Sequence, residues 1–250
     1  MRLLAAWEET ELQAEVTKLS GGLQGPVQEY VALVQALAGE RLLAVTIFGA
    51  AAEAGAGKTE AIQSVVVLDR VDLDFVRELG AQGPILGRMR IQAPLLMTPE
   101  YIAASLDTFP IELLDIRQRH VNVVGEDHFA PLEFRKADVR LQLERELKRE
   151  LIQMRQGILS AGGRDKVLAD IYWGASEQTL SLLRAVLWLH DKPVPAGPAA
   201  IVEAAEEDTG VKLPGLGPAV AGAREIDFSA LRSLYDSVIA LANYIDGLSV

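Results

Sequence analysis

The sequence predicts an α+β protein in which a small mixed-sheet α/β domain is followed by an α-helical bundle domain. Short β-rich runs alternate with helical segments in the first half, whereas apolar residues recur at helical spacing from Ala137 onward. The chain has 250 residues, half of them hydrophobic, so it is long enough to bury a sizeable core. We therefore expect two domains, residues 1–136 with N-terminal helices and residues 137–250.

Two runs rich in β-branched residues predict the first strands of the sheet. They are "RLLAVTIF" at 41–48 and "AIQSVVVL" at 61–68. Two helices are predicted before them, at 7–19 and 26–39, the second with Pro26 near its start and Gly39 as its stop.

Three further elements are predicted before the helical half. "DLDFVRELG" indicates a short helix capped by Asp72 or Asp74, and "PLLMTPEYIAASLDTFP" indicates a strand and then a helix opening at Thr98. The apolar run "IELLDI" at 111–116 is interpreted as a buried strand.

The helical half begins with a long amphipathic segment, "ADVRLQLERELKRELIQMRQGILSAGG". Steps of three and four residues place one set of apolar side chains on a single face: Leu143, Leu147, Leu151, Met154 and Ile158. Glu144 and Lys148 form a favourable i,i+4 pair on the other side. Two further helices are predicted after Pro/Gly-rich connectors.

Composition excludes several classes of function. The formal charge is −11, from 35 acidic and 24 basic residues, and nucleic-acid binding needs clustered cations, so we expect no nucleic-acid partner. There is no cysteine, which removes disulfides and thiolate metal sites. The apolar runs are too short for a membrane span. We expect a cytoplasmic protein with no membrane association.

The stretch "AEAGAGKT" at 52–59 is close to a P-loop, with Ala52 in place of the first glycine. A P-loop needs a helix after its Lys-Thr pair, so that the helix N-terminus faces the phosphates. Here only two residues precede the strand-like run "IQSVVVL". The context favours an Ala/Gly-rich turn with a solvated Lys58, and a P-loop ATPase is the less favoured interpretation.

A different frame fits the same residues. "FGA", ten intervening residues and then "AIQS" resembles the signature of the polymerase-β-type nucleotidyltransferase superfamily. Downstream, "LLMTPEYIAASLDTFPIELLDIRQRHVNVVGED" followed by "RLQLERELKRELIQMRQGIL" is similar to uncharacterised bacterial nucleotidyltransferase-like proteins with a helical C-terminal domain. The resemblance covers residues 27–160 best. It implies the fold predicted above.

The resemblance also implies where a site would lie. Gly49 and Ala50 match the Gly-Ser corner that grips phosphates, and Ala61 and Gln63 match the two carboxylates that hold magnesium. Alanine offers no oxygen and glutamine only a neutral one, whereas Mg²⁺ prefers charged oxygen ligands. We therefore expect these metal positions to be degenerate. The candidate nucleotide-binding residues are Gly49, Ala50 and Lys58.

Two acidic residues of the predicted third strand are candidates to replace the missing carboxylates. Glu112 is closer to the family pattern than Asp115, and alternation along a strand allows at most one of them to face a cleft. Structural roles are the favoured alternative for both. We therefore expect no catalytic residue and no bound metal.

The function expected from the sequence is that of a catalytically degenerate nucleotidyltransferase-like protein. It would bind a nucleotide or small ligand weakly, or act as a regulatory or interaction scaffold for a protein partner. The alternative is an active nucleotidyltransferase that uses displaced carboxylates, and only then are Mg²⁺ and ATP expected as cofactors. An Ala/Leu-rich helical half is also compatible with a homodimer.

Overall fold

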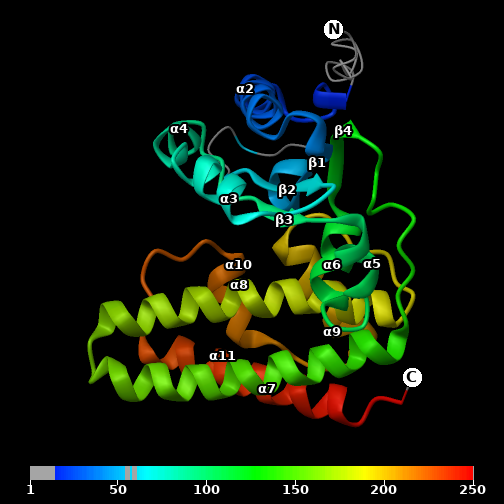
Figure 1. The fold of residues 1–250 in the computed structure, drawn as a ribbon. Helices are drawn as coiled ribbons and strands as arrows, with labels where there is room; N and C mark the ends of the chain where they lie inside the picture. The colour runs from blue at the N-terminus through cyan, green and yellow to red at the C-terminus, as the bar shows by residue number, and fades with distance from the viewer. Residues whose placement is uncertain (1–14, 54–56, 58–60, 250) are drawn as a thin grey trace, which may run out of the picture. The chain divides into compact units, whose positions relative to one another are not determined.

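The computed structural model describes residues 15–53, 57 and 61–249, which form two compact units (Figure 1). The first unit runs to Leu106 and takes in Glu112–Glu133 as well. The second unit comprises Asp107–Ile111 and the chain from Phe134 onward. The first unit holds the sheet, and the second is helical.

One four-stranded sheet forms the centre of the first unit, in the order β3-β2-β1-β4. Its strands are β1 (Leu42–Phe48), β2 (Gln63–Leu68), β3 (Leu95–Met97) and β4 (His120–Gly125). The strands predicted in 41–48, in 61–68 and before Thr98 are therefore confirmed.

The pairing of the strands makes the sheet mixed. β1 pairs antiparallel with both β2 and β4, whereas β2 and β3 run parallel. All but the first residue of β2 are buried, which is why this run is apolar without alternation. The expected α+β class, with a small mixed sheet and a helical part, is confirmed.

Helix α2 (Gly21–Ala38) supplies the apolar layer against the sheet. Its buried face belongs to one hydrophobic cluster with residues of β1 and β2. Tyr30 reaches from this helix to Ser64 on β2, and their hydroxyl groups form a buried hydrogen bond of 2.8 Å. Burial raises the pKa of Tyr30. The helix ends where Gly39 adopts φ +58°, a left-handed conformation that glycine tolerates.

The short helices of this unit begin at predicted caps. Asp72 accepts a hydrogen bond from the Phe75 N–H at the start of α3 (Leu73–Gly80), so Asp72 rather than Asp74 is the cap. Thr98 caps α5 (Pro99–Ala104) in the same way. Between them lies α4 (Gly83–Arg88).

The strand predicted at 111–116 is wrong, because this segment belongs to helix α6 (Pro110–Gln118). A short apolar run does not distinguish a strand from a buried helix turn. Proline suits the first helical position, and the next N–H, of Ile111, donates to Oε1 of Gln142 at 2.8 Å. This cap comes from a residue 31 positions away, which periodicity cannot reveal.

The second unit is a bundle of three main helices, which pack against one another: α7 (Lys136–Ala161), α8 (Asp165–Leu189) and α11 (Phe228–Asp246). Figure 1 shows α7 and α8 as long helices side by side. The connecting chain contains α9 (Pro198–Thr209), η3 (Pro214–Leu216) and α10 (Gly217–Val220). No helix of the described residues is long and apolar enough to span a membrane.

The predicted apolar face of α7 is the face that packs into this bundle. Leu143, Leu147, Leu151 and Met154 are buried, and Ile158 is half-buried near the helix end. On the opposite side Nζ of Lys148 lies 2.6 Å from Oε1 of Glu144, so the predicted pair forms.

The backbone of η3 packs directly against the backbone of α11 at Gly215. A Cβ on Gly215 would lie 2.2 Å from Cα of Leu234, so only glycine fits this contact. The Gly215 carbonyl accepts a hydrogen bond from the Tyr172 hydroxyl on α8, and its N–H donates to Oγ of Ser237 on α11. This short segment thereby joins two helices of the bundle.

Glu150 is a buried carboxyl group on α7, only 1% exposed. Thr179 on α8 is hydrogen-bonded to its Oε1 at 2.8 Å, while Oε2 has no partner in the described residues. Burial, aided by the charge of Glu146, raises the pKa of Glu150 to about 7, although the bond to Thr179 opposes the shift. The folded protein therefore holds a proton that the unfolded chain releases at lower pH.

We predict that the stability of the wild type falls as pH rises from about 4.5 to about 7, because Glu150 must then ionise while buried. The shift in the pKa of Glu150 corresponds to on the order of 3 kcal/mol in the free energy of unfolding. This contribution is present below about pH 4.5 and is lost above pH 7. Glu150→Gln should remove this dependence and unfold at higher urea concentration than the wild type at pH 8. Exposed Glu207→Gln is the control. If the difference in the free energy of unfolding between Glu150→Gln and the wild type is the same at pH 4.5 and at pH 8, the prediction is wrong.

Candidate functional site

The candidate site predicted from the sequence lies at the end of β1, where the chain enters the turn η2 (Gly49–Ala52). Gly49 is buried with φ +72°, and Ala50 is exposed. The Gly49 N–H donates to the Arg119 carbonyl at 2.9 Å. Because this hydrogen bond extends the pairing of β1 with β4, the amide that would face a phosphate already has a partner.

Gln63 fills the space beside this corner. It is the first residue of β2 and is paired with Phe48. A Cβ placed on Gly49 would lie 2.5 Å from Oε1 of Gln63, so the glutamine amide packs directly on the glycine. Gly49 is favoured as glycine chiefly by its left-handed backbone, because the end of the flexible Gln63 side chain could shift away from a Cβ.

Ala61 lies outside the strand and is exposed. Ile62 forms an isolated bridge with Ile91, and the regular ladder of β2 begins only at Gln63. The two positions matched to the metal carboxylates are therefore one exposed methyl group and one neutral amide packed on Gly49. Neither supplies an anionic oxygen for a divalent cation.

Arg119 forms ion pairs with two acidic residues near this corner. Its guanidinium donates to both carboxylate oxygens of Asp115, with a shortest distance of 2.5 Å, and to Oε1 of Glu53 at 2.8 Å. Burial alone would lower the pKa of Arg119, but hydrogen bonds and charges from Asp115 and Glu53 raise it overall. Both carboxylates are therefore held by a cation of the protein itself.

Glu112 and Asp115, the candidate third-strand carboxylates, both lie on helix α6 rather than on a strand. The rule that only one of them can face a cleft, which holds for a strand, therefore does not apply. On a helix, a separation of three residues makes them neighbours on the surface. Glu112 is exposed and Asp115 is half-buried against Arg119. Neither is presented by the sheet.

The sheet itself carries no acidic residue in any of its four described strands. The strands adjacent to β2 are β1 and β3, and both are apolar apart from Thr46, whose hydroxyl donates to Oδ1 of Asn122 on β4. The described residues also contain no group of three or more His, Asp or Glu side chains able to hold a metal ion.

A histidine–aspartate pair stands at the start of β4. Nε2 of His120 lies 2.9 Å from Oδ2 of Asp127, and Nδ1 lies 3.1 Å from the Arg117 carbonyl. Burial alone would raise the pKa of Asp127, but hydrogen bonds from His120 and from two backbone N–H groups lower it overall. The sequence does not reveal this pair, because a histidine and an aspartate seven residues apart match no motif.

Lys58 and most of the P-loop-like stretch lie outside the described residues. The described chain resumes at Ala61 and enters β2 two residues later. The strand that directly follows the stretch is confirmed, so the described residues after it contain no helix of the kind a P-loop requires.

No family model matches the chain, and no curated protein matches its sequence. Its fold is similar to that of a spectinomycin adenyltransferase from Enterococcus faecialis, solved with ATP and spectinomycin. The TM-score is 0.57 with 12% identity, over 89% of this chain and 98% of the other. At this identity the likeness shows the fold alone, which is nucleotidyltransferase-like with a helical domain.

We predict that Gly49→Ala destabilises the first unit, because alanine disfavours φ +72° and its Cβ would meet Oε1 of Gln63. The left-handed backbone alone costs about 1–2 kcal/mol. The double variant Gly49→Ala/Gln63→Ala should recover the part of the lost unfolding free energy that comes from the contact with Gln63. A double-mutant cycle, measured by urea unfolding, gives this part. Strictly additive effects of the two substitutions would show that the contact is absent.

Proposed function

We propose that this chain is a nucleotidyltransferase-like protein without transferase activity, which acts as a weak binder of a nucleotide or small ligand, or as a regulatory or interaction scaffold. The observation that carries the proposal is the absence of any carboxylate on the four described strands. Transfer of a nucleotidyl group depends on metal ions that neutralise the triphosphate, and such ions need anionic oxygens at fixed positions.

The surroundings of Gly49 support the same proposal. Asp115 and Glu53 are carboxylates that could in principle replace the two missing metal ligands. Both are bound to Arg119. Recruiting them to Mg²⁺ would leave a guanidinium without its partners and place it beside a dication. The Gly49 N–H is likewise engaged with the Arg119 carbonyl.

The similar solved structure contains ATP and spectinomycin, which supplies the probes for a test. We predict that the wild type shows no micromolar, magnesium-dependent binding of ATP by calorimetry, with or without spectinomycin, and no release of pyrophosphate. Weak binding that is equal in Mg²⁺ and in EDTA agrees with the proposal. Magnesium-dependent micromolar binding together with pyrophosphate release would overturn it.

A gain of metal binding is expected when the missing charges are supplied. Ala61→Asp/Gln63→Asp should bind Mg²⁺ or Mn²⁺ at least tenfold more tightly than the wild type, as measured by calorimetry. The matched control, Ala61→Asn/Gln63→Asn, has nearly the same shape without the charge and should not. Equal affinities of the two double variants for Mg²⁺ or Mn²⁺ would show that these positions do not form a metal-binding site.

The rival function, an active enzyme with displaced carboxylates, makes an opposite prediction for the wild type. If Mg·ATP binds, Glu112→Gln or Asp115→Asn should abolish the binding under this rival. Exposed Glu78→Gln on α3 is the control for a lost surface charge. For the P-loop alternative, Lys58→Ala would remove ATP hydrolysis, and we expect no such activity to be present.

A further inference from the structure

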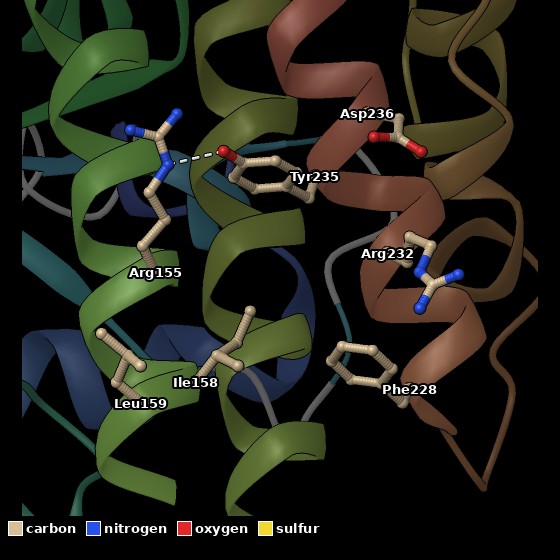
Figure 2. Close-up of a pocket in the computed structure, with 7 residues that line it drawn as sticks. All are labelled: Arg155, Ile158, Leu159, Phe228, Arg232, Tyr235 and Asp236. Carbon is tan, nitrogen blue, oxygen red and sulfur yellow. Dashed lines mark hydrogen bonds between the residues drawn. The ribbon is translucent and has the colours of Figure 1, made fainter.

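A pocket of about 690 Å³ opens on the helical unit between α7 and α11, and Figure 2 shows its lining. Ligand pockets commonly measure about 300–1,000 Å³. The residues that line it come from the last turns of α7 and the first turns of α11: Arg155, Ile158, Leu159, Phe228, Arg232, Tyr235 and Asp236. None of them belongs to the corner around Gly49.

Large apolar side chains are exposed at this pocket. Leu159 is 82% exposed and Phe228 is 44% exposed, and Ile158 completes the apolar part of the lining. In Figure 2, Leu159 and Ile158 on α7 lie across the opening from Phe228 on α11. Leu159 lies outside the predicted buried stripe of α7, so packing within the bundle does not explain an apolar residue there.

Two guanidinium groups are held at the pocket by aromatic rings. Nε of Arg155 donates to the Tyr235 hydroxyl at 2.5 Å, and its guanidinium carbon lies 5.5 Å from the centre of that ring. Arg232 lies 5.4 Å above the Phe228 ring. These contacts orient the two guanidinium groups and leave other N–H groups of each available to a ligand.

Neither arginine forms a salt bridge with a carboxylate of the described residues, whereas many other basic residues of this acidic chain do. Asp236 is the one acidic residue of the lining, against two guanidinium groups. The pocket is therefore a locally cationic, mostly apolar site on a protein whose formal charge is −11.

We propose that this pocket is a binding site for an organic monoanion with an apolar body, of the hydrophobic carboxylate class. The apolar body would cover Ile158, Leu159 and Phe228, which removes exposed hydrocarbon from water. The carboxylate would accept hydrogen bonds from Arg155 or from Arg232, which Figure 2 shows at opposite ends of the pocket, each with an aromatic partner that restricts its side chain. This proposal is independent of the proposed function, because it uses no residue of the sheet.

The test compares two probes that differ in charge and little in shape, 1-naphthaleneacetate and 1-naphthaleneacetamide. Calorimetry or chemical-shift titration of the full chain at pH 7 should give at least tenfold tighter binding of the acid than of the amide. Raising the salt concentration should narrow this difference, since the charged contacts are exposed.

Substitutions of the lining then separate the charged from the apolar contribution. At least one of Arg155→Gln and Arg232→Gln should weaken binding of the acid about fivefold or more and leave binding of the amide unchanged. Asp236→Asn should strengthen binding of the acid, and Phe228→Ala should weaken both probes. Exposed Arg145→Gln on α7, away from the pocket, is the matched control and should change neither. Circular dichroism melting shows that each variant is folded.

Three results would overturn the proposal. One is equal affinity for the acid and the amide, and another is acid binding that Arg155→Gln, Arg232→Gln and Asp236→Asn leave unchanged. The third is a concentration-dependent dimer in sedimentation velocity that Phe228→Ala or Leu159→Ser disrupts, since the occupant would then be a second copy of the chain.

Discussion

The hydrogen bond from the Gly49 N–H to the Arg119 carbonyl ties the turn after β1 to the beginning of β4. Gln63 packs on the same glycine from β2, so three strands meet at one residue whose left-handed backbone favours glycine. This constraint closes the corner in the described chain. A phosphate could reach the Gly49 amide only by breaking the strand-extending hydrogen bond.

The distribution of charge is a second feature of this unit. The chain has 35 acidic residues, yet none lies on the described strands. Of those near the site, Asp115 and Glu53 bind Arg119, and Asp127 is hydrogen-bonded to His120. A carboxylate bound to a guanidinium serves structure, because releasing it to a metal costs the ion pair and leaves a cation nearby. An acidic protein can therefore have a nucleotidyltransferase-like fold with no acidic sheet face.

The helical unit uses polar groups in two different ways. Glu150 is enclosed between α7 and α8, where the unpartnered Oε2 makes its ionised form costly. Arg155 and Arg232 keep their charge at the surface beside exposed hydrocarbon, where Arg155 is hydrogen-bonded to Tyr235 and Arg232 lies over the Phe228 ring. The buried carboxyl couples the stability of the bundle to pH, while the arginines give its surface one cationic, apolar hollow.

Local patterns were sufficient for the strands β1 and β2, the cap Thr98 and the apolar face of α7, because each depends on residues within a few positions of one another. The neutrality of Ala61 and Gln63 was equally visible in the sequence. Only the tertiary structure decided that residues 111–116 are helical, where Gln142 caps Ile111, and that Asp115 and Glu53 both bind Arg119. These contacts join positions up to 66 apart along the chain, and side-chain periodicity carries no information about such partners.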